Sequence, residues 1–398
     1  MSGRGPAGAP TAAARPAGLG TAFALALAAA VSLGLARFSY ALLLPPMRAD
    51  LGWSYFTAGA MNTVNAAGYL LGALLLPRVL GRWDARRVML AGGGAAAVAL
   101  ALHGVVLAEA GLFALRLATG VASAATFVAG GLLAARLAQG SARPGLVLGL
   151  YYGGTGIGIV ASALVVPPLA GAAVAHAWQQ AWLALGALAA LCTVLTAVAT
   201  GALAAHPSAA GARQAARWPR FAWALGAYLM FGLGYIGYMT FVVTLLREQG
   251  LPPGLIVAFY VLLGLGVVAS SWLWAGLLQR FKGGQPLALL NGLLALATLL
   301  PVLSAHPAAV FASGALFGAV FLSVVAGTTA FVRHNLPPAA WPAGISAFTI
   351  VFAAGQIVGP SITGWVADGA GGLARGFVLS AGALALGSLL ATRQRPLP

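Results

Sequence analysis

The sequence predicts an all-α membrane protein whose twelve transmembrane helices form two pseudo-symmetric six-helix bundles. Three observations carry this prediction: the composition, the distribution of basic residues and an internal repeat. Of the 398 residues, 61% are hydrophobic and only 7% are charged, and the mean hydropathy is +0.95. A soluble domain carries about 25% charged residues. The composition therefore excludes a soluble globular protein and favours one that lies mostly within a membrane.

Charges, prolines and tryptophan-flanked ends divide the chain into apolar stretches, each about the ~20 residues that a helix needs to cross a bilayer. The predicted spans are 20–44, 56–80, 88–108, 112–137, 146–171, 178–204, 221–246, 254–279, 285–305, 308–332, 342–366 and 371–391. An even number of spans places both termini on the same side of the membrane.

The basic residues are distributed unevenly between the two sides. Sixteen of the 21 lysines and arginines fall in the termini and alternate loops of one side. Basic loops are retained in the cytoplasm, so we expect both termini to be cytoplasmic in a multi-pass protein of the bacterial inner membrane. The formal charge of +16 does not indicate nucleic-acid binding, which requires a clustered basic face.

An internal repeat relates the two halves of the chain. Seven residues of the first half recur 198 to 202 positions later. The matched pairs are Gly34 and Gly232, Tyr40 and Tyr238, Gly52 and Gly250, Gly120 and Gly318, Arg78 and Arg280, Gly154 and Gly355, and Gly158 and Gly359. Two parallel halves with a site between them are typical of a secondary transporter. The predicted division is a disordered cytoplasmic tail (1–19), an N-terminal bundle (20–205), a cytoplasmic linker (206–220) and a C-terminal bundle (221–398).

An arginine within the first span is the most informative residue. Arg37 stands in an apolar run and lies ten residues before Met47, roughly 15 Å from the outer end at 1.5 Å per residue. Burying it there costs about 2.5–3.5 kcal/mol, and none of the five acidic residues falls in the middle of a span. We therefore expect water, a partner or a ligand to face Arg37.

Several segments together resemble the major facilitator superfamily. The stretch GALLLPRVLGRWDARR (Gly72–Arg87) is similar to its cytoplasmic signature, LRLATGVASA (Leu115–Ala124) to its fourth-helix motif, and GQIVGPSITG (Gly355–Gly364), with Gly355, Gly359 and Pro360, to its GxxxGP packing motif. The opening RFSYALLLPPM (Arg37–Met47) resembles the YbfB-type bacterial branch. The resemblance covers residues 20–391 and brings no known substrate.

The chain departs from the signature at one functional position. Pro77 and Gln279 stand where the superfamily has an aspartate that holds the outward-facing state. Arg78 and Arg280 remain beside them. The resemblance also implies that the first, second, fourth and fifth helices of each half line a central cavity. Arg37 and Arg116 fall on such helices, so both are candidates for gripping an anionic substrate, although Arg116 would also suit hydrogen bonds to helix carbonyls.

Polar and aromatic residues at helical spacing complete the predicted cavity wall. The substrate-binding candidates beside the two arginines are Tyr40, Asn62, Asn65, Tyr69, Tyr151, Tyr235, Tyr238 and Gln356. Gly72, Arg78, Arg280, Gly355, Gly359 and Pro360 are candidates for gating or packing. Small and polar side chains also hold helices together in lipid, so each candidate has a packing alternative.

Secondary transport by alternating access is the predicted function, with a small organic anion or carboxylate as substrate. The alternative is efflux of hydrophobic or cationic drug-like compounds. We expect no enzymatic activity, metal or cofactor, because no cluster of His, Cys, Asp and Glu converges and no nucleotide-binding loop is present. The expected partners are the substrate, the bilayer, and protons or a counter-substrate; we expect no nucleic acid, and a monomer.

Overall fold

The computed structural model describes residues 18–171, 174–201, 203 and 218–397. Within them, twelve helical stretches are long and apolar enough to cross a membrane, which confirms the predicted number. The predicted tail (1–19) and linker (206–220) fall almost wholly outside the described residues, and the two bundle boundaries stay predictions.

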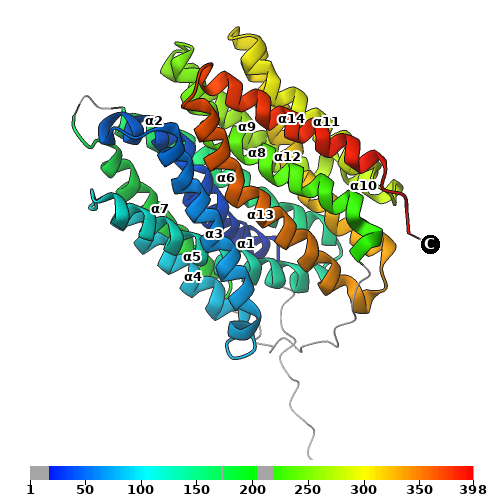
Figure 1. Cartoon of the computed structure of the whole chain (residues 1–398). Coiled ribbons are helices and arrows are strands. Elements are labelled where there is room, and N and C mark those ends of the chain that lie inside the picture. Colours follow the sequence, from blue (N-terminus) through cyan, green and yellow to red (C-terminus); the bar gives the residue numbers. More distant parts are fainter. Residues whose placement is uncertain (1–17, 172–173, 202, 204–217, 398) are drawn as a thin grey trace, which may run out of the picture.

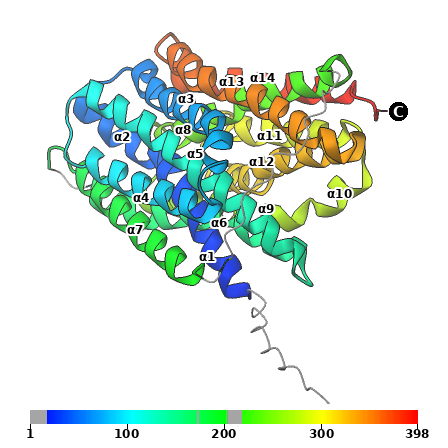
Figure 2. The same ribbon diagram turned by 90° about the horizontal axis from the view of Figure 1, so that it is seen from below.

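The chain forms two bundles that lie side by side (Figure 1; Figure 2). The first comprises α1 (Leu19–Ala29), a π-helical segment (Ala30–Phe38), α2 (Tyr40–Leu51), α3 (Tyr55–Leu80), α4 (Ala85–His103), α5 (Glu109–Gln139), α6 (Pro144–Ala170) and α7 (Trp178–Ala199). The second comprises α8 (Ala222–Glu248), α9 (Pro253–Leu273), α10 (Ala275–Arg280), α11 (Gln285–Leu303), α12 (Pro307–Asn335), α13 (Trp341–Ala367) and α14 (Gly372–Thr392). Short 3₁₀ turns occupy Trp218–Phe221 and Pro338–Ala340.

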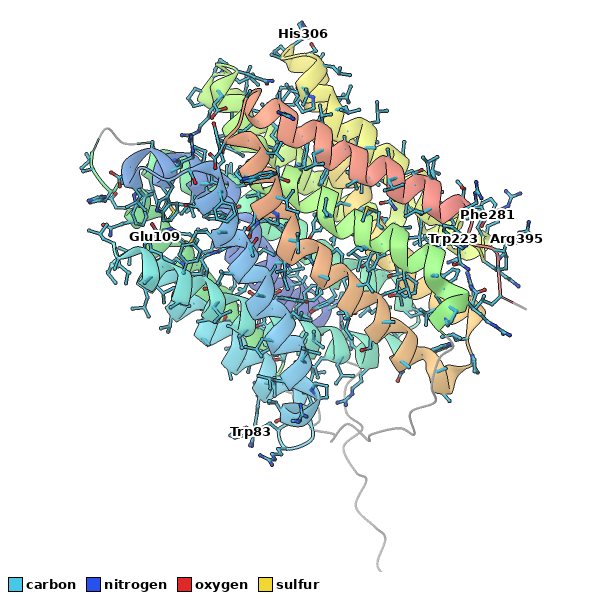
Figure 3. All side chains as sticks on the ribbon, in the orientation of Figure 1. Trp83, Glu109, Trp223, Phe281, His306 and Arg395 are labelled. Carbon is cyan, nitrogen blue, oxygen red and sulfur yellow. The ribbon has the colours of Figure 1, made fainter. Side chains whose placement is uncertain are left out.

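The two ends of the molecule differ in charge. The basic end carries the segments that follow α3, α10 and α14, where Arg82, Lys282 and Arg393 lie. The opposite end carries Glu109 and the first turns of α5 and α12. In Figure 3, Trp83 and Phe281 mark the basic end, and Glu109 and His306 mark the opposite end.

The first span is longer than predicted and irregular. It runs from Leu19 to Leu51, and its middle is π-helical, as the bond from Ser39 N to the Gly34 carbonyl shows (3.0 Å). π-Helical insertions are uncommon and occur frequently at functional sites. This segment contains Arg37.

Glycines give the repeat a physical meaning. A Cβ added at Gly120 of α5 would lie 2.1 Å from the Asn65 carbonyl oxygen, and one at Gly318 of α12 would lie 2.1 Å from that of Leu263. Both the glycines and the residues they meet are 198 positions apart. The two halves therefore use the same backbone approach at equivalent places, and a side chain there would push the helices apart.

The GxxxGP segment packs α13 against helices on two sides. A Cβ at Gly355 would lie 2.5 Å from the Leu229 carbonyl oxygen of α8. The carbonyl oxygen of Pro360 lies 2.3 Å from a Cβ placed on Gly59 of α3. Small residues thus let α13 contact its own bundle and the other bundle at once.

The two halves also meet through polar contacts at the end opposite the basic loops. Asp368, after α13, accepts hydrogen bonds from the Tyr55 and Phe56 amides at 2.8 and 2.9 Å and so caps α3 of the other half. Glu248 of α8 accepts from the Tyr55 hydroxyl and lies 3.9 Å from Arg48. We call these five residues the outer seal.

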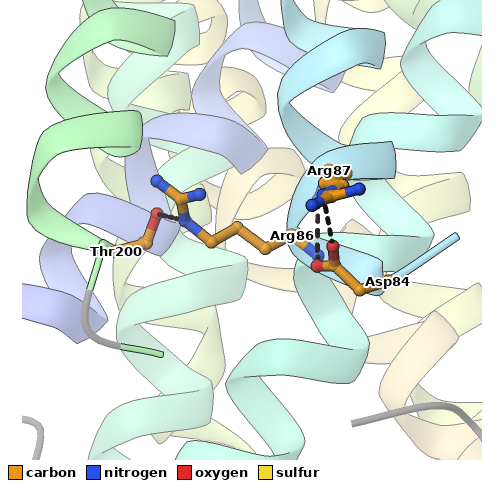
Figure 4. A network of polar contacts seen from close by, with 4 residues as sticks. All are labelled: Asp84, Arg86, Arg87 and Thr200. Carbon is orange, nitrogen blue, oxygen red and sulfur yellow. Dashed lines mark hydrogen bonds and ion pairs between the residues drawn. The ribbon is translucent and has the colours of Figure 1, made fainter. Parts of the chain in front are cut away.

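In the part of the chain that the structure describes, the carboxylate of the signature segment, Asp84, contacts residues of its own half. Asp84 caps α4 through the Arg86 and Arg87 amides at 2.9 and 3.2 Å, and it pairs with the Arg87 guanidinium at 3.2 Å. Arg86 Nε donates to Thr200 Oγ1 after α7 at 3.2 Å (Figure 4). Arg78 and Arg280 are exposed at the basic end. Gly72 packs against α5, since an added Cβ would lie 2.8 Å from the Val121 carbonyl oxygen.

Substitution of two adjacent glycines of α6 tests the close packing of this helix against α1. A Cβ at Gly154 would lie 2.0 Å from the Ala26 carbonyl oxygen, whereas one at Gly153 would meet nothing closer than 3.7 Å. Gly154→Ala should destabilise the protein by about 1–3 kcal/mol. Gly153→Ala should be neutral or stabilise it by about 0.5–1 kcal/mol through helix propensity. Thermal unfolding in detergent measures both, and equal stabilities would contradict the packing account.

Removal of the Asp368 cap should weaken the outer seal. A lost N-cap costs about 1 kcal/mol, so Asp368→Ala should increase the population that is open at this end about fivefold. Spin labels at the exposed positions Ala49 and Gly254, in a Cys192→Ala background, would report longer distances by electron resonance. Asp84→Ala, which removes a cap within one half, is the matched control and should leave the distances unchanged. An unchanged distribution in Asp368→Ala would contradict the seal.

Candidate functional site

A cavity of about 420 Å³ lies between the two bundles, within the range of about 300–1,000 Å³ typical of small-molecule sites. Its lining extends toward the basic end, where α6 begins and α10 and α12 end, and includes Gly145, Leu278 and Arg333. The outer seal lies at the other end. The described lining therefore reaches the basic end of the molecule and includes none of the outer-seal residues.

Arg37 lies at the deep end of this cavity and joins the two halves. The π-helical segment carries it, and its Nη2 donates to Gln356 Oε1 on α13. The same oxygen accepts a hydrogen bond from the Tyr235 hydroxyl on α8 at 2.6 Å. One amide oxygen thus accepts from a guanidinium of the first half and a phenol of the second.

The guanidinium of Arg37 is incompletely satisfied. The side chain is only 4% exposed, and Nε has no hydrogen-bond partner among the described residues. The described part of the chain also provides no salt bridge to it. The rings of Tyr69 and Phe38 lie 5.9 and 6.0 Å from Cζ, at the outer limit of a cation–π contact. A buried cation that no described carboxylate neutralises is suited to bind an anion.

The rest of the lining is apolar and aromatic with scattered hydroxyls. Hydroxyls come from Ser270, Ser271, Ser323 and Thr329 of α9 and α12. At the mouth, the Arg333 guanidinium lies 5.1 Å from the Trp341 ring. No aspartate or glutamate of the described chain lines the cavity.

Four of the ten predicted substrate-binding residues meet in the cavity: Arg37, Tyr69, Tyr235 and Gln356. They come from the first, second, seventh and eleventh spans, so residues far apart in sequence converge as the fold prediction requires. Tyr235 and Gln356 bond directly, and Arg37 bonds to the latter.

Arg116 lies elsewhere, inside the first bundle. It is fully buried, donates to the Ala36 carbonyl and Asn62 Oδ1, each at 3.1 Å, and faces the Tyr40 ring at 4.7 Å. Asn65 Nδ2 in turn donates to the Arg116 carbonyl at 3.1 Å. The carbonyl alternative weighed for this arginine is thus the arrangement that the structure has.

The remaining candidates also have packing partners in this conformation. Asn62 donates to Thr240 Oγ1 at 2.7 Å and so crosses to the other half. The hydroxyls of Tyr40 and Tyr151 donate to the carbonyls of Ala58 and Phe127, and that of Tyr238 bonds with Ser313. None of these tyrosines or asparagines, nor Arg116, lines the cavity. Their assignment to substrate binding stays a prediction.

Sequence reasoning missed several lining residues. Tyr152 lines the cavity while the predicted Tyr151 points into the bundle, and Phe127, Phe321 and Arg333 were not singled out. Phe317, four residues before Phe321 on the same face of α12, does not line the cavity and stacks on Tyr238, with ring centroids 3.9 Å apart. His103 is buried against Trp182, with ring centroids 4.4 Å apart, away from the cavity.

Comparisons with known proteins agree with this architecture. Residues 29–392 match the model of a family described as the uncharacterised MFS-type transporter YbfB. A comparison with curated protein sequences found no match.

Solved structures share the fold. The nucleoside transporter NupG has a TM-score of 0.70 and 15% identity over 94% of this chain and 98% of its own. A bacterial homologue of the human lysosomal transporter Spinster, inward-facing and occupied, has a TM-score of 0.71 and 14% identity over 95% and 97%. At such identities the likeness concerns the fold alone. The family match covers most of the sequence and the cavity lies between two six-helix bundles, so this chain belongs to the major facilitator superfamily, in the family of the MFS-type transporter YbfB, and is a multi-pass membrane transporter of a small molecule rather than an enzyme.

Proposed function

We propose that this transporter moves a small organic anion, such as a carboxylate, by alternating access, with Arg37 as the anion anchor. The observation that carries the proposal is the charge of the cavity. Two arginines, Arg37 and Arg333, line it, and no acidic residue of the described chain does. Because a guanidinium binds carboxylates in a bidentate manner, Arg37 is complementary to that group.

Energetics favour the same conclusion. A buried arginine costs about 2.5–3.5 kcal/mol on insertion scales, and a neutral amide such as Gln356 offsets its charge only in part. A carboxylate would supply both a full counter-charge and two acceptor oxygens. Ligand binding would then relieve a cost that the empty protein bears.

Alternating access is supported by the placement of binding groups on both halves. Arg37 and Tyr69 belong to the first bundle, and Tyr235 and Gln356 to the second. A ligand held by both would couple binding to rocking of the bundles. The outer seal and the opening at the basic end make this the conformation open to one side.

We further propose that the basic end faces the cytoplasm of a bacterial inner membrane, so that both termini are cytoplasmic and this conformation is inward-facing. The excess of basic residues in its loops supports this orientation. We also propose that the protein acts as a monomer. Since no carboxylate of the described chain lines the cavity, a coupling proton would travel with the substrate, a counter-substrate would be exchanged, or transport would be facilitated.

The second candidate function is efflux of hydrophobic or cationic drug-like compounds. The aromatic lining favours it, since rings of Phe231, Tyr235 and Phe352 are among those that face the cavity. The two arginines oppose a cationic ligand. The two functions therefore differ in the sign of the charge that is transported.

Uptake into proteoliposomes distinguishes these functions. Radiolabelled carboxylates and drug-like cations should be compared with and without a pH gradient. At substrate concentrations below saturation, Arg37→Met should lower the rate of carboxylate uptake about 100-fold, because the buried charge that pairs with the carboxylate is lost. Arg37→Lys should lower the same rate about tenfold, because an ammonium does not bind a carboxylate bidentately.

Arg375→Met is the matched control, since Arg375 is exposed and, among the described residues, its side chain bonds to the Ala370 carbonyl at 3.4 Å. It should transport at the wild-type rate. Transport of cations but not anions, with Arg37→Met unaffected, would overturn the anion proposal.

Substitution of Gln356 tests whether the positive charge of Arg37 is needed for anion binding. Gln356→Glu puts a carboxylate beside Arg37 and should lower anion affinity at least tenfold, equivalent to about 1.4 kcal/mol. Gln356→Leu removes the amide without adding charge, so it should lower anion affinity less than Gln356→Glu does. Binding by titration calorimetry, with thermal unfolding as a folding check, ranks the two variants. Higher anion affinity in Gln356→Glu than in Gln356→Leu would contradict the prediction.

A further inference from the structure

The cavity is much richer in aromatic residues than the chain as a whole. Aromatic residues make up 9% of the sequence but eight of the 25 residues that line the cavity. Four come from each bundle: Phe38, Tyr69, Phe127 and Tyr152 from the first, and Phe231, Tyr235, Phe321 and Phe352 from the second. Anion binding alone does not require this enrichment, so it calls for a separate explanation in the ligand.

The four rings of the second bundle are nearly parallel and form what we call the aromatic wall. The planes of Phe231 and Phe352 differ by 10°, with centroids 5.4 Å apart. Those of Tyr235 and Phe321 also differ by 10°, at 6.0 Å, and those of Phe231 and Tyr235 by 18°, at 4.7 Å. Offset parallel rings are a favoured stacking geometry. A flat ring that enters beside them can extend the stack.

The rings of the first bundle are arranged differently. Phe127 and Tyr152 lie at 60° to each other, and Phe38 meets Phe321 of the wall edge-on at 83°. The parallel arrangement is therefore specific to one side of the cavity. A planar ligand would stack on the second bundle and be bordered by ring edges from the first.

The anion anchor lies at the edge of the aromatic wall. Gln356 Oε1 accepts from both Arg37 and the hydroxyl of the wall residue Tyr235, so the guanidinium and this hydroxyl share one acceptor atom. A carboxylate on Arg37 would bring a ring attached directly, or through one carbon, against Tyr235 and its stacked neighbours. We therefore expect the ligand to be a short acid.

We propose that the substrate is a planar aromatic monocarboxylate of the benzoate type, with its carboxylate on Arg37 and its ring on the aromatic wall. This proposal rests on the proposed anion transport and names its substrate class. Aromatic cations do not fit, because Arg37 at the deep end and Arg333 at the mouth are both positive. Aliphatic acids satisfy the anchor but gain nothing from the parallel rings.

Binding of four matched compounds to the purified full-length protein tests the proposal by titration calorimetry. Benzoate has the charge and the flat ring, cyclohexanecarboxylate the charge without the flat ring, benzamide the ring without the charge, and benzylammonium the ring with the opposite charge. Benzoate should bind about five- to tenfold more tightly than cyclohexanecarboxylate, which is the advantage that stacking provides. Benzamide and benzylammonium should bind at least tenfold more weakly than benzoate.

A wall variant supplies the second measurement. In Phe352→Leu the ratio of benzoate to cyclohexanecarboxylate affinity should fall toward one. Phe377→Leu is the matched control, since Phe377 is buried beside Tyr238 outside the cavity, and its ratio should equal that of the wild type. A ratio of affinities is unaffected by the fraction of folded protein, so it separates a binding role from a structural one.

Each outcome bears on one of the two proposals. Equal, Arg37-dependent affinity for both carboxylates would overturn the aromatic substrate and leave anion transport standing. A preserved preference in Phe352→Leu would overturn the role of the wall. Absence of binding by either carboxylate, or benzamide binding as tightly as benzoate, would overturn the anion function itself and the aromatic substrate with it.

Discussion

The structure depends on one constraint, the burial of the Arg37 guanidinium without a counter-ion. The side chain is 4% exposed, and water cannot fully solvate it there. Its main protein partner, Gln356, belongs to the other bundle, so the contact that stabilises the charge also holds the halves together. The π-helical segment carries this cation to the cavity between the two bundles, and the sign of the proposed ligand follows from its charge.

Close helix packing makes that placement possible. A Cβ added at Gly34, three residues before Arg37, would lie 2.5 Å from the Gly158 Cα of α6, so the arginine-bearing segment is held against the neighbouring helix by backbone contact. Gly59 and Pro360 do the same between the two bundles. Lipid offers no hydrophobic driving force between helices, and small residues provide dispersion contacts instead. The anchor is therefore rigid on one side and faces an empty space on the other.

The sequence predicted the number of spans, the repeat and the exceptional status of Arg37, because hydropathy and the cost of a buried charge are properties of single residues. It could not predict which way each helix is rotated. Tyr151 and Tyr152 are adjacent, about 100° apart on a helix, and only the second lines the cavity. For Arg116 the sequence left both substrate binding and hydrogen bonds to helix carbonyls open, and only the structure shows that it bonds the Ala36 carbonyl. Such differences arise from tertiary contacts, which periodicity does not contain.

The repeat explains why the anchor and the aromatic wall meet. Arg37 and Tyr235 are 198 positions apart and so are equivalent in the two halves, and both donate to Gln356 Oε1. Equivalent positions of two related bundles come together at the axis between them, where one has become cationic and the other phenolic. An amide oxygen serves both donors with a single atom. A carboxylate is a stronger acceptor and has two oxygens, so it can accept from both donors at once and displace the amide. Ligand binding would thereby release the contact that Gln356 makes between the two halves.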